Sequence, residues 1–195
     1  MANLRRTQAS LIYKVCVILL LGLKDSVDGL VQDNIIFAIN AGGPFHVDDN
    51  GIRYQEDPLG EDGIASDFGR RLNIQHVSES DQILYQTERY TVADSFGYNI
   101  PVTKDGDYVL VLKFSEVYFR AVRGKVFDVR LNEEHTVIEN LDIFFYVGYA
   151  TALDIAVPFA VVKNVKQLIL ENGENSPIYG RNIPLDFLKV SSLPA

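Results

Sequence analysis

The sequence predicts an all-β domain, an antiparallel β-sandwich of the jelly-roll kind, and two observations lead to this prediction. Short segments rich in β-branched and aromatic residues recur along the chain, separated by turns that contain glycine or asparagine. No long segment shows the apolar repeat of an amphipathic helix. The 195 residues, 47% hydrophobic and 23% charged, suffice for one folded domain and a processing segment.

The predicted strands begin at residue 35. A short apolar strand over Ile35–Asn40 ends in a glycine pair, Gly42-Gly43, which permits a tight bend. Asn50-Gly51 is a turn dipeptide, and the polar segment 55–69 is predicted to be a long loop that forms the wall of a site. Segment 82–90 is partly strand-like and partly irregular. Further strands are expected over 107–120, 125–131, 136–143, 157–162, 167–172 and 183–190.

The strand over 107–120 is the most informative of these. One face of it is apolar at every second residue, whereas the other face turns polar toward the strand's end. This pattern is typical of a strand that begins in a core and emerges from it, delivering Tyr118, Phe119 and Arg120. Because side chains alternate along a strand, Tyr118 and Phe119 cannot both face one core. We therefore expect an exposed aromatic binding platform there.

Charge and cysteine content exclude several classes of function. The net charge of −8 argues against a nucleic-acid partner, since neutralising phosphates requires clustered Lys and Arg. The single cysteine, Cys16, lies in the N-terminal segment, so no disulfide or cysteine-based zinc site is expected beyond it. His46, His76 and His135 are scattered without metal-ligand spacing. We expect no cofactor and no metal.

Residues 1–29 are predicted to be a secretory signal peptide, which leaves residues 30–195 as the domain. Basic residues precede an apolar run over 15–23, and the small residues Ser26 and Gly29 follow it. The run is too short to span a bilayer comfortably, because about 20 apolar residues are needed. An uncleaved signal anchor or a buried helix is the alternative interpretation of this segment.

Five motifs in one order resemble the malectin family of carbohydrate-binding lectins. They lie between residues 35 and 189, and their sequences are Asn40-Ala41-Gly42-Gly43, Ser66-Asp67-Phe68-Gly69, Gln86-Thr87-Glu88-Arg89-Tyr90, Phe96-Gly97-Tyr98 and Leu112-Lys113-Phe114-Ser115-Glu116-Val117-Tyr118-Phe119. The resemblance implies a β-sandwich lectin of the endoplasmic reticulum that is not an enzyme. It also implies glucose-terminated, diglucosylated high-mannose N-glycans as ligands during early glycoprotein processing.

The resemblance implies site residues and partners as well. Tyr90, Tyr118 and Phe119 match the family's aromatic cluster, and Phe68 stands where the family carries a tyrosine, so a ring remains without its hydroxyl. Aromatic rings suit the apolar C–H face of a sugar, whose hydroxyls need directional polar partners. The implied partners are a glucose disaccharide or glucosylated N-glycan, nascent glycoproteins and the oligosaccharide transferase complex.

The chain departs from the family pattern in two places. No aspartate matches the one that the family carries after the strand corresponding to Leu185–Lys189, and the family's closing strand, acidic tail and membrane anchor are not found. Such a shortened domain is expected to leave a sheet edge unpaired. Around Phe145-Tyr146 the segment 142–149 is more apolar than the charged version in the family.

Two other classes of function remain open on the sequence. A glycoside hydrolase needs two carboxylates roughly 5–10 Å apart, and Asp67, Glu88 and Glu116 are the candidates near the platform. Each of them has a simpler interpretation as a turn cap, an ion-pair partner or a solvated charge. A glycan-independent protein-interaction module would use the same aromatics as a hot spot for a polypeptide.

Overall fold

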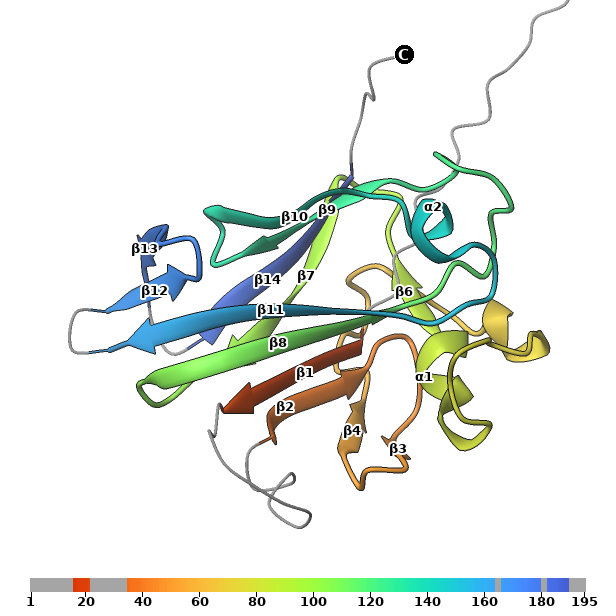
Figure 1. Cartoon of the computed structure of the whole chain (residues 1–195), viewed down its shortest axis with the longest axis horizontal. Coiled ribbons are helices and arrows are strands. Elements are labelled where there is room, and N and C mark those ends of the chain that lie inside the picture. The colour runs from red at the N-terminus through yellow and green to blue at the C-terminus, as the bar shows by residue number, and fades with distance from the viewer. Residues whose placement is uncertain (1–15, 22–34, 164–165, 180–181, 190–195) are drawn as a thin grey trace, which may run out of the picture.

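The structure is a computed structural model that describes residues 16–21, 35–163, 166–179 and 182–189. Two β-sheets face each other, as the sequence predicts (Figure 1). The larger sheet has eight strands in the order β13 (Asn175–Pro177), β12 (Gln167–Leu170), β11 (Leu153–Val162), β8 (Gly106–Phe114), β1 (Cys16–Leu21), β2 (Ile35–Asn40), β4 (Arg53–Glu56) and β3 (His46–Val47).

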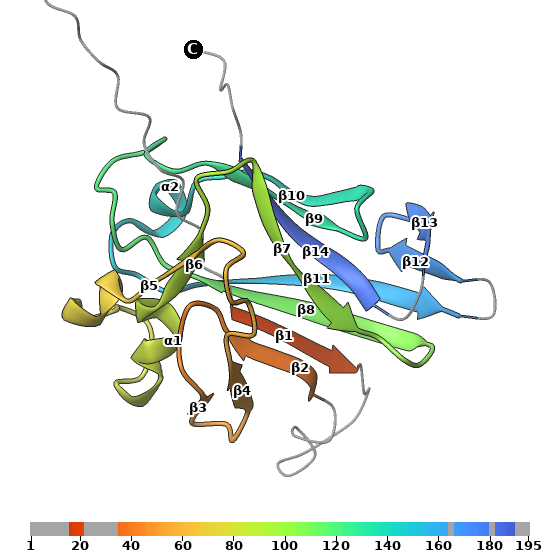
Figure 2. The same cartoon turned by 180° about the vertical axis from the view of Figure 1, so that it is seen from behind.

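The smaller sheet has four strands, and a separate pair lies beside the sandwich. The four are β10 (His135–Leu141), β9 (Phe127–Leu131), β14 (Asn182–Lys189) and β7 (Ser95–Pro101). The pair consists of β5 (Ile64–Ser66) and β6 (Glu88–Tyr90), seen side by side in Figure 2. Strand pairing is antiparallel throughout these sheets except between β2 and β4.

The helical parts are short and lie in the connections. They are 3-10 turns over Phe68–Arg71 and Ser80–Gln82 and the helices α1 (Ile83–Gln86) and α2 (Ile143–Val147). The side chain of Asp142 caps α2 by accepting a hydrogen bond from the Phe145 N–H. Within the residues described, no helix has both the length and the apolar composition needed to cross a membrane.

The core lies between the two sheets and follows the period-two pattern of the sequence. On β8 the side chains of Tyr108, Leu110, Leu112 and Phe114 are buried, while those between them are partly exposed. On β9 the buried face consists of Phe127, Val129 and Leu131. Phe114 and Phe127 join the sheets through an edge-to-face ring contact of 5.7 Å between centroids. The predicted sandwich is therefore confirmed, including the buried faces of these two strands.

The strand predicted over 107–120 is shorter than expected. It ends at Phe114, and Glu116 then pairs with Tyr149 as an isolated bridge. The Glu116 carboxylate oxygen Oε1 accepts hydrogen bonds from the N–H groups of Tyr118 (2.8 Å) and Phe119 (2.9 Å). One carboxylate can reach N–H groups two and three residues ahead only where the backbone turns, so the strand cannot continue. The expectation that Tyr118 and Phe119 alternate along a strand is wrong.

Among the described residues, six strands are ones that the sequence pattern does not predict. Three of them are short, namely β3, β4 and β5, and β5 lies inside the segment 55–69 that is predicted to be a loop. β7 lies over a motif with glycine at its centre, and β13 has only three residues. β1 lies within the segment predicted to be a signal peptide, and it takes a central place in the large sheet between β8 and β2. By contrast, β2 has the predicted bounds.

Candidate binding site

Three of the four predicted platform rings meet at one end of the sandwich. The Phe68 and Tyr118 rings are 5.2 Å apart between centroids, at an interplanar angle of 63°. The Tyr118 and Phe119 rings are 5.1 Å apart at 77°. Both contacts are edge-to-face. Tyr118 is 51% exposed, and Phe68 and Phe119 are half-buried.

Tyr90 reaches this end of the molecule from another element. It is the last residue of β6, opposite Ile64 of β5, and is half-buried. Among the described residues, the recorded ring contacts join Phe68, Tyr118 and Phe119 and do not include Tyr90. The structure thus brings three predicted residues into one cluster and places the fourth on the neighbouring strand pair.

Two arginines and a glycine shape the surroundings of the rings. The Arg71 guanidinium lies 4.2 Å from the Phe68 ring centroid, and that of Arg120 lies 4.1 Å from the Tyr149 centroid. A Cβ atom on Gly124 would come within 2.8 Å of the Phe119 Cβ atom. Gly124 therefore allows the Phe119 side chain to pack closely against the following loop.

A buried charge cluster holds the backbone that carries Tyr118 and Phe119. The Lys125 ammonium nitrogen lies 3.0 Å from Glu116 Oε2 and 4.0 Å from Glu88 Oε2, and all three residues are at most 2% exposed. The other carboxylate oxygen of Glu116 holds the Tyr118 and Phe119 N–H groups. The backbone of Tyr118 and Phe119 is thereby fixed to the cluster, and Glu88 connects the cluster to β6, the strand of Tyr90.

A polar cavity of about 550 Å³ is lined by chain neighbours of Phe68 and Tyr90, although none of the four predicted rings is part of its wall. Its wall includes Asp67, Arg70 and Arg89. Asp67 precedes Phe68 in the chain, Arg70 lies two residues after it, and Arg89 precedes Tyr90. Asp67 and Arg70 are exposed, so their charged groups are accessible to a ligand. The segment 56–60 also lines the cavity, together with Ala65. The predicted loop 55–69 thus lines a cavity, although it also contains the end of β4, the strand β5 and the start of the 3-10 turn Phe68–Arg71. That this cavity belongs to a binding site stays a prediction.

The loop wall of this cavity is tied down by Arg89, which is 3% exposed. Its Nε donates to Asp57 Oδ2 at 2.6 Å, Nη1 donates to the Asp62 carbonyl at 2.7 Å, and Nη2 donates to the Leu59 carbonyl. Asp57 Oδ2 also accepts a hydrogen bond from the Gly42 N–H. Burial and the neighbouring charge of Asp57 raise the pKa of the Tyr98 hydroxyl well above its usual range.

Gly42 lets two segments of this wall approach each other closely. Its φ angle is +68°, and a Cβ atom there would meet the Glu88 carbonyl oxygen. The Thr87 hydroxyl donates to Asn40 Oδ1 at 2.9 Å, so β2 and β6 are joined at this point. No local pattern in the sequence marks Arg89 or Lys125 as supporting residues, because their partners lie far away along the chain.

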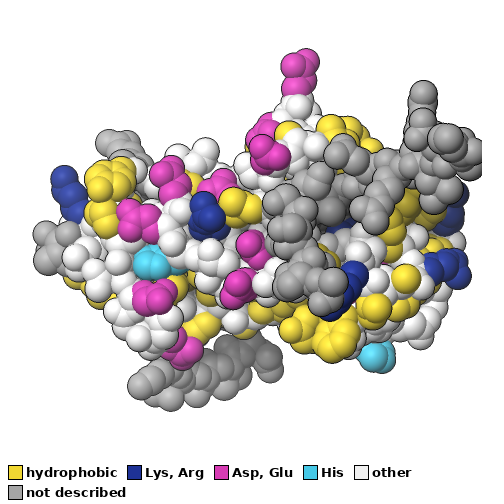
Figure 3. Space-filling view, turned by 90° about the horizontal axis from the view of Figure 1, so that it is seen from above, with side chains coloured by type: hydrophobic (Ala, Val, Ile, Leu, Met, Phe, Trp, Pro, Cys, Tyr) yellow, Lys and Arg dark blue, Asp and Glu magenta, His cyan; other side chains and the backbone are white. Residues whose placement is uncertain are grey.

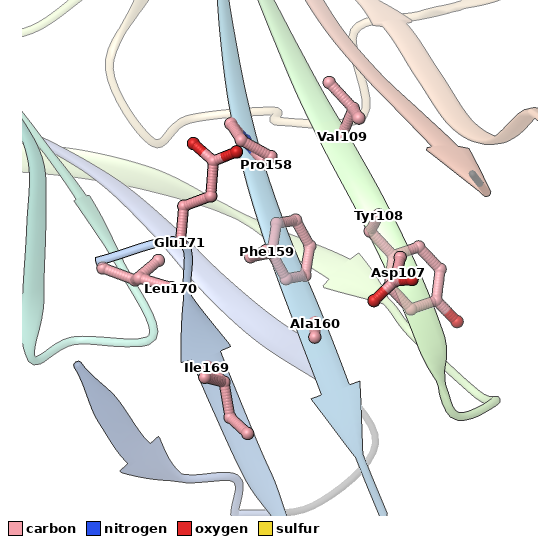
Figure 4. A pocket seen from close by; sticks show the side chains of 9 residues that line it. All are labelled: Asp107, Tyr108, Val109, Pro158, Phe159, Ala160, Ile169, Leu170 and Glu171. Carbon is pink, nitrogen blue, oxygen red and sulfur yellow. The ribbon is translucent and has the colours of Figure 1, made fainter. Parts of the chain in front are cut away.

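A second cavity, of about 300 Å³, is apolar and lies near the opposite end of β8 (Figure 4). Tyr108 and Phe159 stack in the core at 5.5 Å between ring centroids, so the alternating Val109, Pro158 and Ala160 occupy the outer face of the sheet. Asp107 and Glu171 also line this cavity. None of the predicted site residues lines it.

Charged side chains are unevenly distributed over the face of the molecule that Figure 3 shows. Viewed from above, most acidic side chains lie over the left and central parts, whereas hydrophobic and basic ones are prominent toward the right-hand end (Figure 3). The right-hand end is the end at which α2 and β6 lie in Figure 1.

Comparison with known proteins shows to which family the chain belongs. The family profile described as "Malectin domain" matches residues 35–183. The chain belongs to the malectin family. It is 50% identical to Malectin-A of Xenopus laevis over 160 residues (82% of this chain and 56% of the relative). It is 45% identical to Malectin of Mus musculus over 193 residues (94% and 64%). The chain thus spans less than two thirds of the length of these malectins.

Solved structures with low sequence identity share the malectin-like fold. The ectodomain of ANX2 from Arabidopsis thaliana has a TM-score of 0.59 and 18% identity, over 78% of this chain and 44% of that one. A β-glucuronidase of Bacteroides uniformis has a TM-score of 0.53 and 20% identity, over 80% of this chain and 16% of that one. At such identities these structures support the fold alone.

Proposed function

We propose that this malectin-family domain binds carbohydrate on the surface formed by Phe68, Tyr118 and Phe119, with Tyr90 at its side. The observation that carries the proposal is the half-exposed Tyr118 ring, held between the Phe68 and Phe119 rings. Asp67 and Arg70, which are close to Phe68 in the chain, line a polar cavity. Ring faces pack against sugar C–H groups, and Asp67 and Arg70 supply charged partners for hydroxyls. A site of this kind needs few polar groups, fixed in place.

The proposed ligand is the glucose-terminated arm of a diglucosylated high-mannose N-glycan, recognised in the endoplasmic reticulum on nascent glycoproteins. The family supports this choice, and so does the predicted secretory segment at residues 1–29. The oligosaccharide transferase complex is the proposed protein partner. The ring of Phe68 lacks a hydroxyl, so we expect stacking rather than hydrogen bonding at that position.

We propose that binding proceeds without catalysis. Hydrolysis would need two carboxylates that reach the scissile bond. Glu88 and Glu116 are 0% and 1% exposed and lie beside Lys125, and Glu116 is already used to hold the platform backbone. Asp67 is the exposed carboxylate of the three candidates. This arrangement supports a binding role for the site.

The test is calorimetric titration of the full chain with an α-linked glucose disaccharide. Tyr118→Ala removes the exposed ring, and we expect affinity to fall at least about tenfold. Tyr179→Ala is the matched control, because Tyr179 is 78% exposed and follows β13 at the other end of the sandwich. Equal affinities of Tyr118→Ala and the parent, or no binding by a folded parent, would refute the proposal.

A second candidate function, glycan-independent binding of a polypeptide, is favoured by α2. Phe145 and Tyr146 are 69% and 64% exposed, and their rings are in edge-to-face contact at 5.5 Å. Exposed aromatic pairs are frequent hot spots of protein interfaces. If a captured polypeptide is lost on Phe145→Ala but is not displaced by free disaccharide, the two surfaces are separate.

A further inference from the structure

Strand β1 lies inside the large sheet, and its place between two neighbouring strands is called the seat. It lies between β8 and β2 and is antiparallel to both (Figure 1). Ile18, for example, lies opposite Val111 of β8 and Ala38 of β2. Both edges of β1 are paired along its length, from residue 17 to 21 with β8 and from 16 to 20 with β2. β1 is thus an interior strand of the sheet.

The sheet depends on this strand for its continuity. In the order of strands, β13, β12, β11 and β8 lie on one side of β1, and β2, β4 and β3 lie on the other. Without β1, the facing edges of β8 and β2 would each present a row of backbone N–H and C=O groups without ladder partners. Such groups are costly inside a fold, and exposed edges invite association.

The two neighbours of β1 both lead to the candidate site. β8 continues to the platform residues Tyr118 and Phe119. β2 ends at Asn40, whose side chain accepts a hydrogen bond from the Thr87 hydroxyl beside β6, and it is followed by Gly42 against the Glu88 carbonyl. The seat of β1 therefore holds together the two halves of the sheet that position the site.

The same residues form the apolar run of the predicted signal peptide. A cleavage near residue 29 would remove β1 from the domain. The run over 15–23 is shorter than the roughly 20 apolar residues that span a bilayer, so it is poorly suited to remain there as an anchor. An uncharged apolar segment is equally suited to the interior of a sandwich.

We propose that the leader is retained: after directing the chain across the membrane, Cys16–Leu21 folds into the large sheet as β1. The seat between β8 and β2 is then a strand-acceptor site, filled by a segment of the same chain. Entry into the secretory pathway is taken from the proposed function, whereas occupation of the seat is independent of sugar binding.

Cys16 provides a direct test, because it is the only cysteine of the chain. The full chain is translated into microsomes, and the protease-protected product is denatured and treated with a maleimide-polyethylene glycol. A retained leader gives a single upward gel shift, which Cys16→Ser abolishes. A protected product that shows no shift has lost β1 and overturns the proposal.

Occupation of the seat is tested on the purified full chain by amide hydrogen exchange. We expect residues 16–21 to be protected as strongly as β8. Ile18→Pro removes a ladder donor and should lower Tm by about 5–10 °C. Glu171→Pro, at the second position of the exposed turn after β12, is the control and should leave Tm within about 2 °C. If the amides of residues 16–21 exchange as fast as in an unfolded chain, or if Ile18→Pro leaves Tm unchanged, the proposal is overturned. This outcome does not depend on the microsome experiment.

Discussion

Lys125 is a cation inside a protein core, where its side chain is 1% exposed. Its ammonium group is flanked by the carboxylates of Glu116 and Glu88, and Glu116 in turn holds the N–H groups of Tyr118 and Phe119. A buried ion pair adds little net stability, but removing one partner is costly. The cluster therefore positions the exposed Tyr118 ring and the half-buried Phe119 ring.

Lys125→Met should therefore destabilise the fold by about 3–5 kcal/mol, because it removes the cation from beside two buried carboxylates. Urea denaturation measures the change. The control is Lys104→Met, where the lysine is exposed and the cost should be below about 0.5 kcal/mol. If both variants are equally stable, the cluster does not support the fold in the way described.

Residue types in the motifs predicted three members of the ring cluster, and the structure places Phe68, Tyr118 and Phe119 in contact. The burial of Lys125 could not be predicted in the same way. Lysine is almost never buried without partners, and its partners come from β6 and from the turn after β8. Only the folded chain brings them together.

At the scale of elements, one guanidinium group holds the loop that precedes β5 in place. Arg89 on β6 contacts Asp57, Leu59 and Asp62 through three different nitrogens. A planar fork of donors can make such contacts simultaneously, whereas a lysine ammonium on the same strand cannot. The shape of the polar cavity follows from this residue.

We expect Arg89→Lys to preserve a positive charge near Asp57 but to release the two carbonyl contacts. Amide exchange over residues 57–66 should accelerate at least about tenfold, and exchange in β9 and β14 should be unchanged. Arg53→Lys is the control at an exposed arginine. Unchanged protection of 57–66 in Arg89→Lys would show that other contacts hold the loop.

On β14, burial and the charge of Glu133 raise the pKa of Asp186 above its ordinary value. The folded state thus holds a proton on Asp186 more tightly than the unfolded chain does, and stability at this site increases as the pH falls. Asp186→Asn should raise Tm at pH 7, and the gain should shrink as the pH falls through the raised pKa toward 3.8. Thermal scans across this range, with exposed Asp94→Asn as control, measure the effect; a gain that grows toward acid pH would contradict it.

Across the whole molecule, the two sheets share one core. Phe127 is fully buried and contacts Phe114 of the large sheet and Phe187 of its own sheet. A ring that bridges both layers contributes to a single cooperative unit. Loss of this ring should therefore affect both sheets together.

Phe127→Ala should destabilise the molecule by about 3–5 kcal/mol, with one unfolding transition seen by all probes. Phe145→Ala, at a residue 69% exposed on α2, should change stability by less than about 0.5 kcal/mol. Circular dichroism and calorimetry report the two variants. Two separate transitions in the parent or in Phe127→Ala would mean that the sheets unfold independently.

The sequence by itself determined the fold class, the buried faces of β8 and β9, the bounds of β2 and the residue types of the ring cluster. Those features depend on local alternation and on motifs within a few residues of one another. The end of β8 at Phe114, the burial of Lys125 and the position of β1 were decided by the tertiary structure. The hydrophobic effect is non-directional, so the apolar composition of the run 15–23 does not by itself say which apolar surroundings it enters, a membrane or a sheet interior. The choice between them lies in the backbone partners that distant strands provide.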